Sequence, residues 1–131
     1  MPTRRNLFTE TLAGFVADPA SMDHHGSGVI VNFAAFTDAS YGTAGSRVIP
    51  AGTVGELDAT SGQFVPHTTG RPLLLVTDAV EGSRVAALSG YGAYTGGNVY
   101  ADLLPAATQA KAAALAPHFY LQTYADVRGA S

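Results

Sequence analysis

The residues of this sequence best suited to hold a metal ion are Asp23, His24 and His25, which directly follow one another. Imidazole nitrogens and carboxylate oxygens are good zinc ligands. Adjacent side chains of an extended chain point to opposite sides, however, and no third and fourth ligand follows at a recognisable spacing. The pattern therefore favours a solvated linker, and we expect neither a metal nor another cofactor. His67 and His118 stand alone in predicted loops, which is typical of surface or interface histidines.

The serine, glycine and carboxylate motifs of catalysis are incomplete. Neither Ser27 nor Ser89 has the glycine two positions earlier that a nucleophile elbow requires. The glycine-rich stretch 90–97 lacks the terminal lysine of a phosphate-binding loop. Glu56 and Asp58 form the only local pair of carboxylates, and no second pair follows to support glycoside hydrolysis. We therefore predict that the protein is not an enzyme.

Charge, hydropathy and cysteine content exclude several classes of protein. Seven Lys and Arg stand against ten Asp and Glu, and Arg4 with Arg5 is the only basic cluster, so we expect no nucleic-acid partner. Polar residues or glycine interrupt every apolar run before the roughly 18 residues of a membrane span, so we expect no membrane partner. Glu10 and Asp18 interrupt the segment after the arginines, which argues against a secretory signal. Without cysteine, the chain forms no disulfide and offers no thiolate ligand.

The composition favours a subunit of a larger assembly. Only 13% of the residues are charged, whereas about a quarter is typical of globular domains. A weakly charged surface rich in small residues suits a protein that packs against copies of itself. A small free β domain fits the composition equally well, so composition alone leaves both interpretations open.

The N-terminal part of the chain is predicted to form an extended arm. Asp18 and Pro19 end a stretch of nearly helical apolar spacing, and the polar, glycine-broken segment that follows is typical of a flexible joint. We assign residues 1–28 to the arm and residues 29–131 to a single β-rich domain. The apolar segment 29–36 fits a buried strand and an anchor of the arm equally well. The apolar positions of the arm are Leu7, Phe8, Leu12, Phe15 and Val16.

Turn residues divide the body of the chain into short predicted strands. Pro50 precedes Gly52 in one turn and Gly62 ends a second reversal, so we expect both glycines to adopt a positive φ. The second reversal makes a hairpin of residues 53–65. The apolar run 73–76 predicts a strand that is buried on both faces. Beyond it we expect a turn at residues 77–83 and strands at residues 84–88 and 90–100.

The C-terminal quarter is predicted to contain one helix. Pro105 stands at a tolerated first-turn position before the alanine-rich residues 106–115, and Pro117 ends the pattern. The aromatic tail 118–127 fits a last strand or an element that contacts a neighbouring subunit. The predicted fold is therefore mainly β with a short C-terminal helix, a small β barrel or sandwich with an extended N-terminal arm.

The turn and hairpin of residues 49–66 read IPAGTVGELDATSGQFVP, and two further apolar segments follow at residues 73–80 and 84–94. In their order and spacing, these segments are similar to those of the phage head decoration protein family, the lambda-type proteins that stabilise capsids. In that family a Pro-Ala-Gly-Thr-Val turn precedes a hairpin that ends in Thr-Gly-aromatic-Val-Pro. The resemblance covers a little under half of the chain, between Arg47 and about Leu104.

The resemblance implies a structural protein of the virion. Such a protein binds the outer surface of the expanded phage capsid as a homotrimer, at local three-fold positions, and resists the pressure of the packaged DNA. It would be made in the host cytoplasm, and its partner would be the major capsid protein. Pro50, Gly52 and Gly62 would then be structural turns, and the arm would contact the capsid. The candidate capsid-binding residues are Arg4, Arg5, Leu7, Phe8, Leu12 and Phe15.

Two other functions stay open at this point. In a small β-barrel module that binds carbohydrate, Tyr91, Tyr94 and Tyr100 would form a platform for stacking sugar rings. An enzyme of unrecognised type is the third alternative. Binding to viral particles would support the decoration protein, whereas binding to glycans would support the carbohydrate-binding module.

Overall fold

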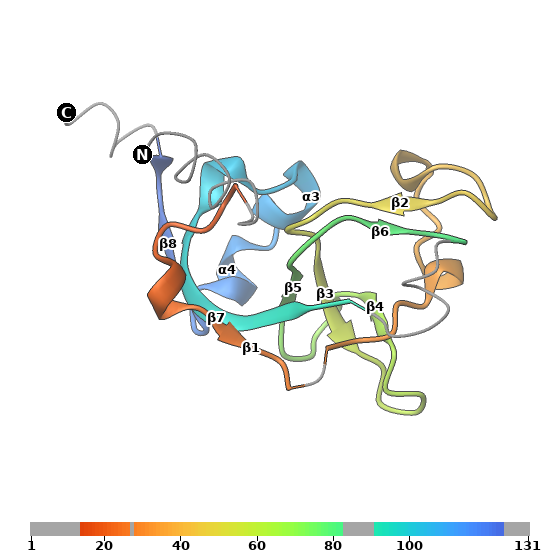
Figure 1. Cartoon of the computed structure of the whole chain (residues 1–131), viewed down its shortest axis with the longest axis horizontal. Helices are drawn as coiled ribbons and strands as arrows, with labels where there is room; N and C mark the ends of the chain where they lie inside the picture. The colour runs from red at the N-terminus through yellow and green to blue at the C-terminus, as the bar shows by residue number, and fades with distance from the viewer. Residues whose placement is uncertain (1–13, 27, 83–90, 125–131) are drawn as a thin grey trace, which may run out of the picture.

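The computed structural model describes residues 14–26, 28–82 and 91–124, which are arranged around a β-sheet (Figure 1). Its strands follow the order β1-β7-β5-β3-β4, and β8 pairs with β7 off this path. Neighbouring strands are antiparallel except β7 and β8, which are parallel. The strands are β1 (Asp23–His24), β3 (Val54–Leu57), β4 (Phe64–Pro66), β5 (Leu73–Leu75), β7 (Ala93–Tyr100) and β8 (Phe119–Gln122).

A second sheet of two strands lies toward one end of the molecule, and β8 lies at the other (Figure 1). The two-stranded sheet consists of the antiparallel strands β2 (Val48–Ile49) and β6 (Ala79–Val80), and we call it the ribbon. The sequence predicts only a turn at residues 77–83, but part of this segment forms β6 because Ala79 packs into the core beneath the ribbon. With eight short strands and two short α-helices in the described residues, the prediction of a mainly β fold is confirmed.

The helix predicted after Pro105 consists of two short pieces. These are α3 (Ala106–Gln109) and α4 (Ala112–Leu115), and they are separated at Lys111, whose backbone has φ −101° and ψ 21°. The alanine-rich sequence favours a continuous helix, so the interruption reflects tertiary packing, in which each piece buries one side chain. The 3-10 helices of the described residues are η1 (Pro19–Ser21), η2 (Phe33–Ala35), η3 (Ala39–Tyr41) and η4 (Ala101–Leu103).

The hairpin predicted at residues 53–65 is present as β3 and β4. Asp58 closes its loop, because the Asp58 carboxylate accepts a hydrogen bond of 2.8 Å from the backbone N–H of Ser61. Chiefly through this bond, the pKa of the exposed Asp58 carboxyl lies below its ordinary value. Gly62 has a φ of 73°, which confirms the predicted positive φ.

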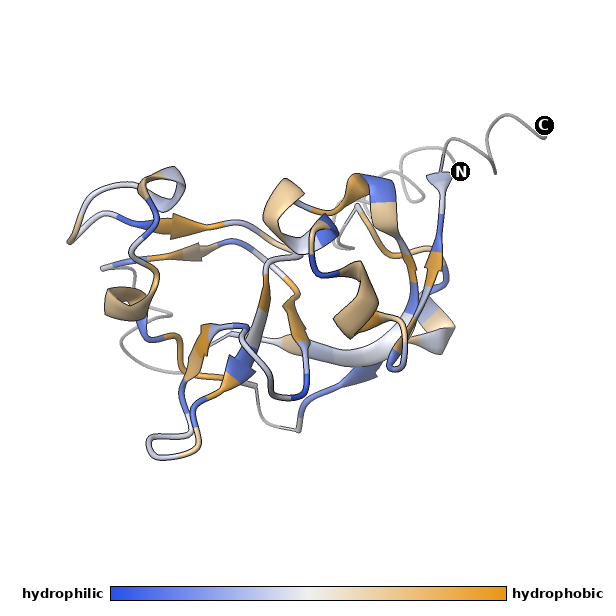
Figure 2. Ribbon diagram, turned by 180° about the vertical axis from the view of Figure 1, so that it is seen from behind, coloured by the Kyte–Doolittle hydropathy of each residue, from blue (hydrophilic) through white to orange (hydrophobic). Residues whose placement is uncertain are grey.

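Strand β5 is buried on both faces, as its apolar sequence predicts. Its side chains alternate between two hydrophobic clusters, which we call the ribbon-side core and the helix-side core. Figure 2 shows the apolar segments of the ribbon and of the helices that contribute to these cores. The ribbon-side core contains Val29, Val31, Phe36, Ile49, Phe64, Leu73, Leu75, Ala79, Tyr91 and Ala93, and the helix-side core contains Phe15, Val54, Leu74, Tyr94, Val99, Leu104, Leu115 and Phe119.

The described part of the predicted arm belongs to the sheet. Val16 forms a bridge with Val99 of β7, and β1 pairs with the same strand. This pairing satisfies backbone groups that would otherwise need water as a partner. Val16 and β1 of the predicted arm are therefore part of the folded sheet, while residues 1–13 lie outside the described part of the chain, and the division at residue 28 stays a prediction.

Two segments that the sequence leaves ambiguous have defined places in the structure. Val29 and Val31 are buried and form isolated bridges to β-structure, so the segment 29–36 begins as buried extended chain before η2. The aromatic tail contains β8 and thus supplies a last strand to the sheet of the same chain. The strand predicted at residues 84–88 lies outside the described residues.

Candidate functional site

Three hydrogen bonds connect the turn at residues 50–52 to distant parts of the chain. The backbone N–H of Ala51 donates to the Asp78 carboxylate (2.8 Å), and that of Gly52 donates to the carbonyl oxygen of Leu75 (2.8 Å). The Thr108 hydroxyl donates to the carbonyl oxygen of Gly52 (2.7 Å). Gly52 has a φ of 84°, which confirms the predicted positive φ. These contacts support a structural role for the turn.

The hydrogen bonds from this turn to α3 are structural contacts that the sequence does not reveal. Thr108 is fully buried, and its hydroxyl also accepts a hydrogen bond of 3.0 Å from the backbone N–H of Val54. A threonine within an alanine-rich helix carries no signal of such a contact, because its partners lie more than fifty residues earlier in the chain.

The candidate capsid-binding residues fall into two groups. Phe15 is 3% exposed, and its ring packs edge-on against Tyr94 at a centroid distance of 6.1 Å. This side chain is therefore a core residue in the structure, because burial of a phenyl ring is strongly favourable. The other candidates, Arg4, Arg5, Leu7, Phe8 and Leu12, lie outside the described residues.

The predicted tyrosine platform is wrong. Tyr91 and Tyr94 are only 7% and 4% exposed, and they belong to different cores on opposite faces of the sheet. The Tyr91 hydroxyl is engaged with the backbone of Val80. Tyr100 is partly exposed and packs edge-on against Tyr124. The three tyrosines therefore cannot stack on one sugar ring.

The adjacent histidines lie on different faces of the sheet. His24 contacts the ring of Tyr94 at a centroid distance of 5.0 Å, on the helix side. His25 lines a pocket on the ribbon side, together with Leu73. Within the described ranges of the chain, no group of three or more His, Asp or Glu is placed to hold a metal ion.

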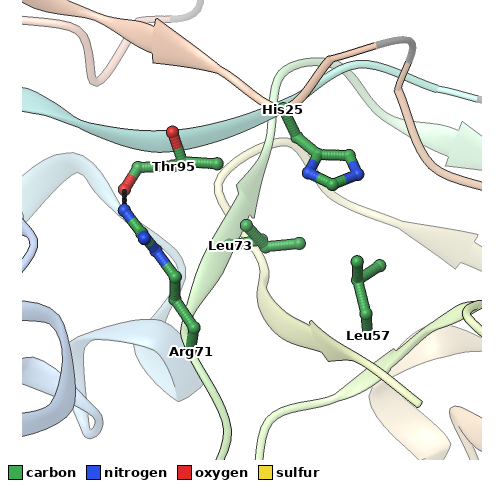
Figure 3. Close-up of a pocket in the computed structure, with 5 residues that line it drawn as sticks. All are labelled: His25, Leu57, Arg71, Leu73 and Thr95. Atoms are coloured by element: carbon green, nitrogen blue, oxygen red, sulfur yellow. Dashed lines mark hydrogen bonds between the residues drawn. The ribbon is translucent and has the colours of Figure 1, made fainter. Parts of the chain in front are cut away.

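An open pocket of about 320 Å³ is lined by His25, Leu57, Arg71, Leu73 and Thr95. Figure 3 shows Leu73 between the side chains of Arg71 and His25. Arg71 precedes β5 by two residues, and its guanidinium donates a hydrogen bond of 3.3 Å to the carbonyl oxygen of Thr95 in β7. The pairing of β3, β5 and β7 thus brings the positive charge of Arg71 close to Leu57 and Leu73.

The loop that leads into Arg71 is held by Glu56 of β3. The Glu56 carboxylate accepts hydrogen bonds from the backbone N–H groups of Thr68 (2.7 Å) and Gly70 (2.9 Å). His67 is 8% exposed, and its Nε2 lies 2.9 Å from the carbonyl oxygen of Gly70. His67 is therefore buried and bonded to the backbone of its own loop, which corrects its expected place at the surface or an interface. His118 is exposed.

The Glu56 contacts predict a titration of this loop in acid. Partial burial raises the pKa of the Glu56 carboxyl, but the hydrogen bonds from Thr68 and Gly70 together outweigh burial and bring the pKa below its ordinary value. The resulting stabilisation is present above the unfolded-state pKa and is lost as the pH falls through the lowered folded-state pKa. We expect the amide resonances of Thr68 and Gly70 to shift together in that lower range in an NMR titration.

Glu56→Gln is expected to abolish this titration, whereas Asp58→Asn, which removes a carboxylate from the neighbouring loop, should leave it unchanged. A midpoint at or above about 4.3, the ordinary value for glutamate, would contradict the assignment.

Comparison with protein-family models, with curated proteins and with solved structures finds no match to this chain. Among the described residues, no helix has both the length and the apolar character of a membrane span.

Proposed function

We propose that this chain is a structural protein of a phage virion that decorates the outer surface of the expanded capsid. It binds as a homotrimer at local three-fold positions and stabilises the shell against the pressure of the packaged DNA. The turn and hairpin of residues 49–66 support this proposal through their resemblance to the head decoration family. The chain is made in the host cytoplasm, and its partner is the major capsid protein.

The observation that carries the proposal is the outward apolar face of the ribbon. Val48 and Val80 are directly paired on β2 and β6, and each is 42% exposed. Paired residues share a face of a sheet, while the next pair, Ile49 and Ala79, points into the ribbon-side core. Exposed apolar side chains grouped on one face are typical of a surface that binds another protein.

The ribbon holds this face in a defined position. The Glu81 carboxylate accepts hydrogen bonds from the backbone N–H groups of Gly45 (3.0 Å) and Arg47 (3.1 Å), and it pairs with the Arg47 guanidinium at 3.4 Å. A preorganised surface loses little conformational entropy when it binds. The fixed position of the Val48 and Val80 side chains on the ribbon therefore favours a role in assembly.

Two further exposed apolar side chains lie on neighbouring elements at the opposite end of the molecule. Tyr120 on β8 is 62% exposed, and Leu103 of η4, which contacts β8, is 45% exposed. The ribbon and β8 lie at different ends of the molecule (Figure 1). A subunit that contacts both copies of itself and a shell needs two separate surfaces, and this arrangement provides them.

Particle binding tests the proposal directly. The chain is expected to co-sediment with expanded capsids, and light scattering is expected to give the mass of a trimer for the free or released protein. Failure to bind particles would overturn the proposal, as would a monomer both in solution and on the particle. A monomer in solution that forms trimers on the capsid would support it.

A charge on the ribbon is expected to weaken assembly. Val80→Asp places a carboxylate in a contact that excludes water, which carries a large desolvation cost, so occupancy on particles should fall at least about tenfold for a loss of roughly 1.4 kcal/mol. Val80→Thr is the matched control, because threonine keeps the β-branched shape without a charge and should lose much less occupancy than Val80→Asp. Equal occupancy of Val80→Asp and the parent would remove the ribbon from the proposed contacts.

A further inference from the structure

We propose that the pocket lined by His25, Leu57, Arg71, Leu73 and Thr95 binds a carboxylate that is joined to a small apolar group. An acidic side chain of the capsid partner, next to an apolar one, is the source of this group. The capsid partner as the source of the carboxylate rests on the proposed function, whereas the binding of a carboxylate depends on the pocket alone.

Arg71 supplies the positive charge for such a ligand. One of its N–H groups donates to the carbonyl oxygen of Thr95, which holds the guanidinium at the edge of the pocket. In the described part of the chain the ion pair is that of Arg47 with Glu81, and Arg71 has no carboxylate partner there. A guanidinium carries five donors in a planar fork, so those that remain match the two oxygens of a carboxylate.

Glu56 and Asp23, two carboxylates of the neighbouring strands β3 and β1, lie on the other face of the sheet. Successive side chains of a strand alternate between the two faces of a sheet, so Glu56 lies on the face opposite to Leu57. Asp23 pairs with Gly96 and not with Thr95, and its carboxylate lies 3.5 Å from where a Cβ of Gly96 would stand. The charge of Arg71 is therefore available to an outside anion.

The rest of the pocket selects for an apolar group beside the charge. Leu57 and Leu73 come from neighbouring strands, and Leu73 also packs in the ribbon-side core. The pocket of about 320 Å³ is at the lower end of the range of roughly 300 to 1,000 Å³ that is typical of ligand sites. This space suits one amino-acid side chain, and a fully hydrated inorganic anion would leave the leucines without a contact.

His25 closes the pocket on the side opposite to Arg71. Its backbone N–H donates to the carbonyl oxygen of Ala93 (2.8 Å), which fixes the residue beside β7. Its imidazole and the Arg71 guanidinium both line the pocket and lie on either side of Leu73 (Figure 3). An imidazole N–H is a hydrogen-bond donor, so both polar side chains at the rim favour a ligand that accepts hydrogen bonds.

Phenylacetate tests the chemistry of the pocket, with phenylacetamide as its uncharged counterpart. We expect phenylacetate to shift the amide resonances of the lining residues saturably, and phenylacetamide to bind at least about tenfold more weakly because it lacks the charge-assisted bonds. Arg71→Gln should weaken phenylacetate binding by a similar factor. Lys111→Gln, which removes a positive charge outside the pocket, should bind as the parent does.

Equal binding of the two probes, or full binding by Arg71→Gln, would overturn the carboxylate site. Particle binding then tests the source of the ligand, with Arg71→Gln expected to reduce capsid occupancy while Lys111→Gln does not. If Arg71→Gln decorates capsids as fully as the parent does, the carboxylate does not come from the capsid partner. If the parent itself fails to bind particles, the proposed function is wrong, and the probe titration still decides whether the pocket binds carboxylates.

Discussion

Replacement of Gly52 by alanine is expected to lower the free energy of unfolding by about 2 to 5 kcal/mol, the sum of a left-handed backbone penalty and an overpacking cost. The φ of 84° is a conformation that side chains rarely adopt. A Cβ at this position would also lie 3.0 Å from Pro105 Cδ and 3.1 Å from carbon atoms of Leu104 and Phe15. Chemical denaturation of the variant and the parent measures the difference.

Gly62→Ala is the matched control for this prediction. Gly62 has a φ of 73°, but a Cβ there would meet no atom within 4 Å. This variant therefore isolates the backbone penalty of about 1 to 2 kcal/mol. If both variants lose the same stability, crowding at the joint of Gly52, Phe15 and Pro105 contributes nothing.

Substitutions of Gly52 and Gly62 also test whether the two turns are structural. A variant that loses stability should decorate particles less only to the extent that it is unfolded. If Gly62→Ala or the bulkier Gly62→Val melts like the parent but no longer binds capsids, the loop at residues 58–62 itself contacts the shell, and its assignment as a structural turn is wrong.

Local backbone chemistry accounts for the features that the sequence predicts correctly. Gly52 and Gly62 adopt their positive φ in turns that local hydrogen bonds close, from the Thr53 N–H to the Pro50 carbonyl oxygen and from the Gly62 N–H to the Asp58 carbonyl oxygen. The double burial of β5 follows from an apolar run that is too short for a buried helix. The residues that specify such a turn or strand lie within it, so these features can be predicted without knowledge of the tertiary fold.

Features that depend on distant segments could not be predicted in the same way. Phe15 belongs to the core only because β7 offers an edge to the residues around it, and the spacing of apolar residues in the arm does not reveal this partner. Tyr91 and Tyr94 are three residues apart in the sequence, yet they face different cores because strand side chains alternate. The pocket at Arg71 likewise exists only once β3, β5 and β7 are paired.

Thr108→Val is expected to cost about 2 to 4 kcal/mol of stability, because it leaves two buried backbone groups without their hydrogen-bond partner. The Thr108 hydroxyl accepts from the N–H of Val54 at 3.0 Å and donates to the carbonyl oxygen of Gly52 at 2.7 Å. Valine fills the same space but can do neither. Thr108→Ser keeps the hydroxyl and removes one methyl group, so its loss should be near 1 kcal/mol. Urea unfolding of the two variants decides the matter: if serine costs as much as valine, the methyl group and not the hydroxyl holds α3 to the turn.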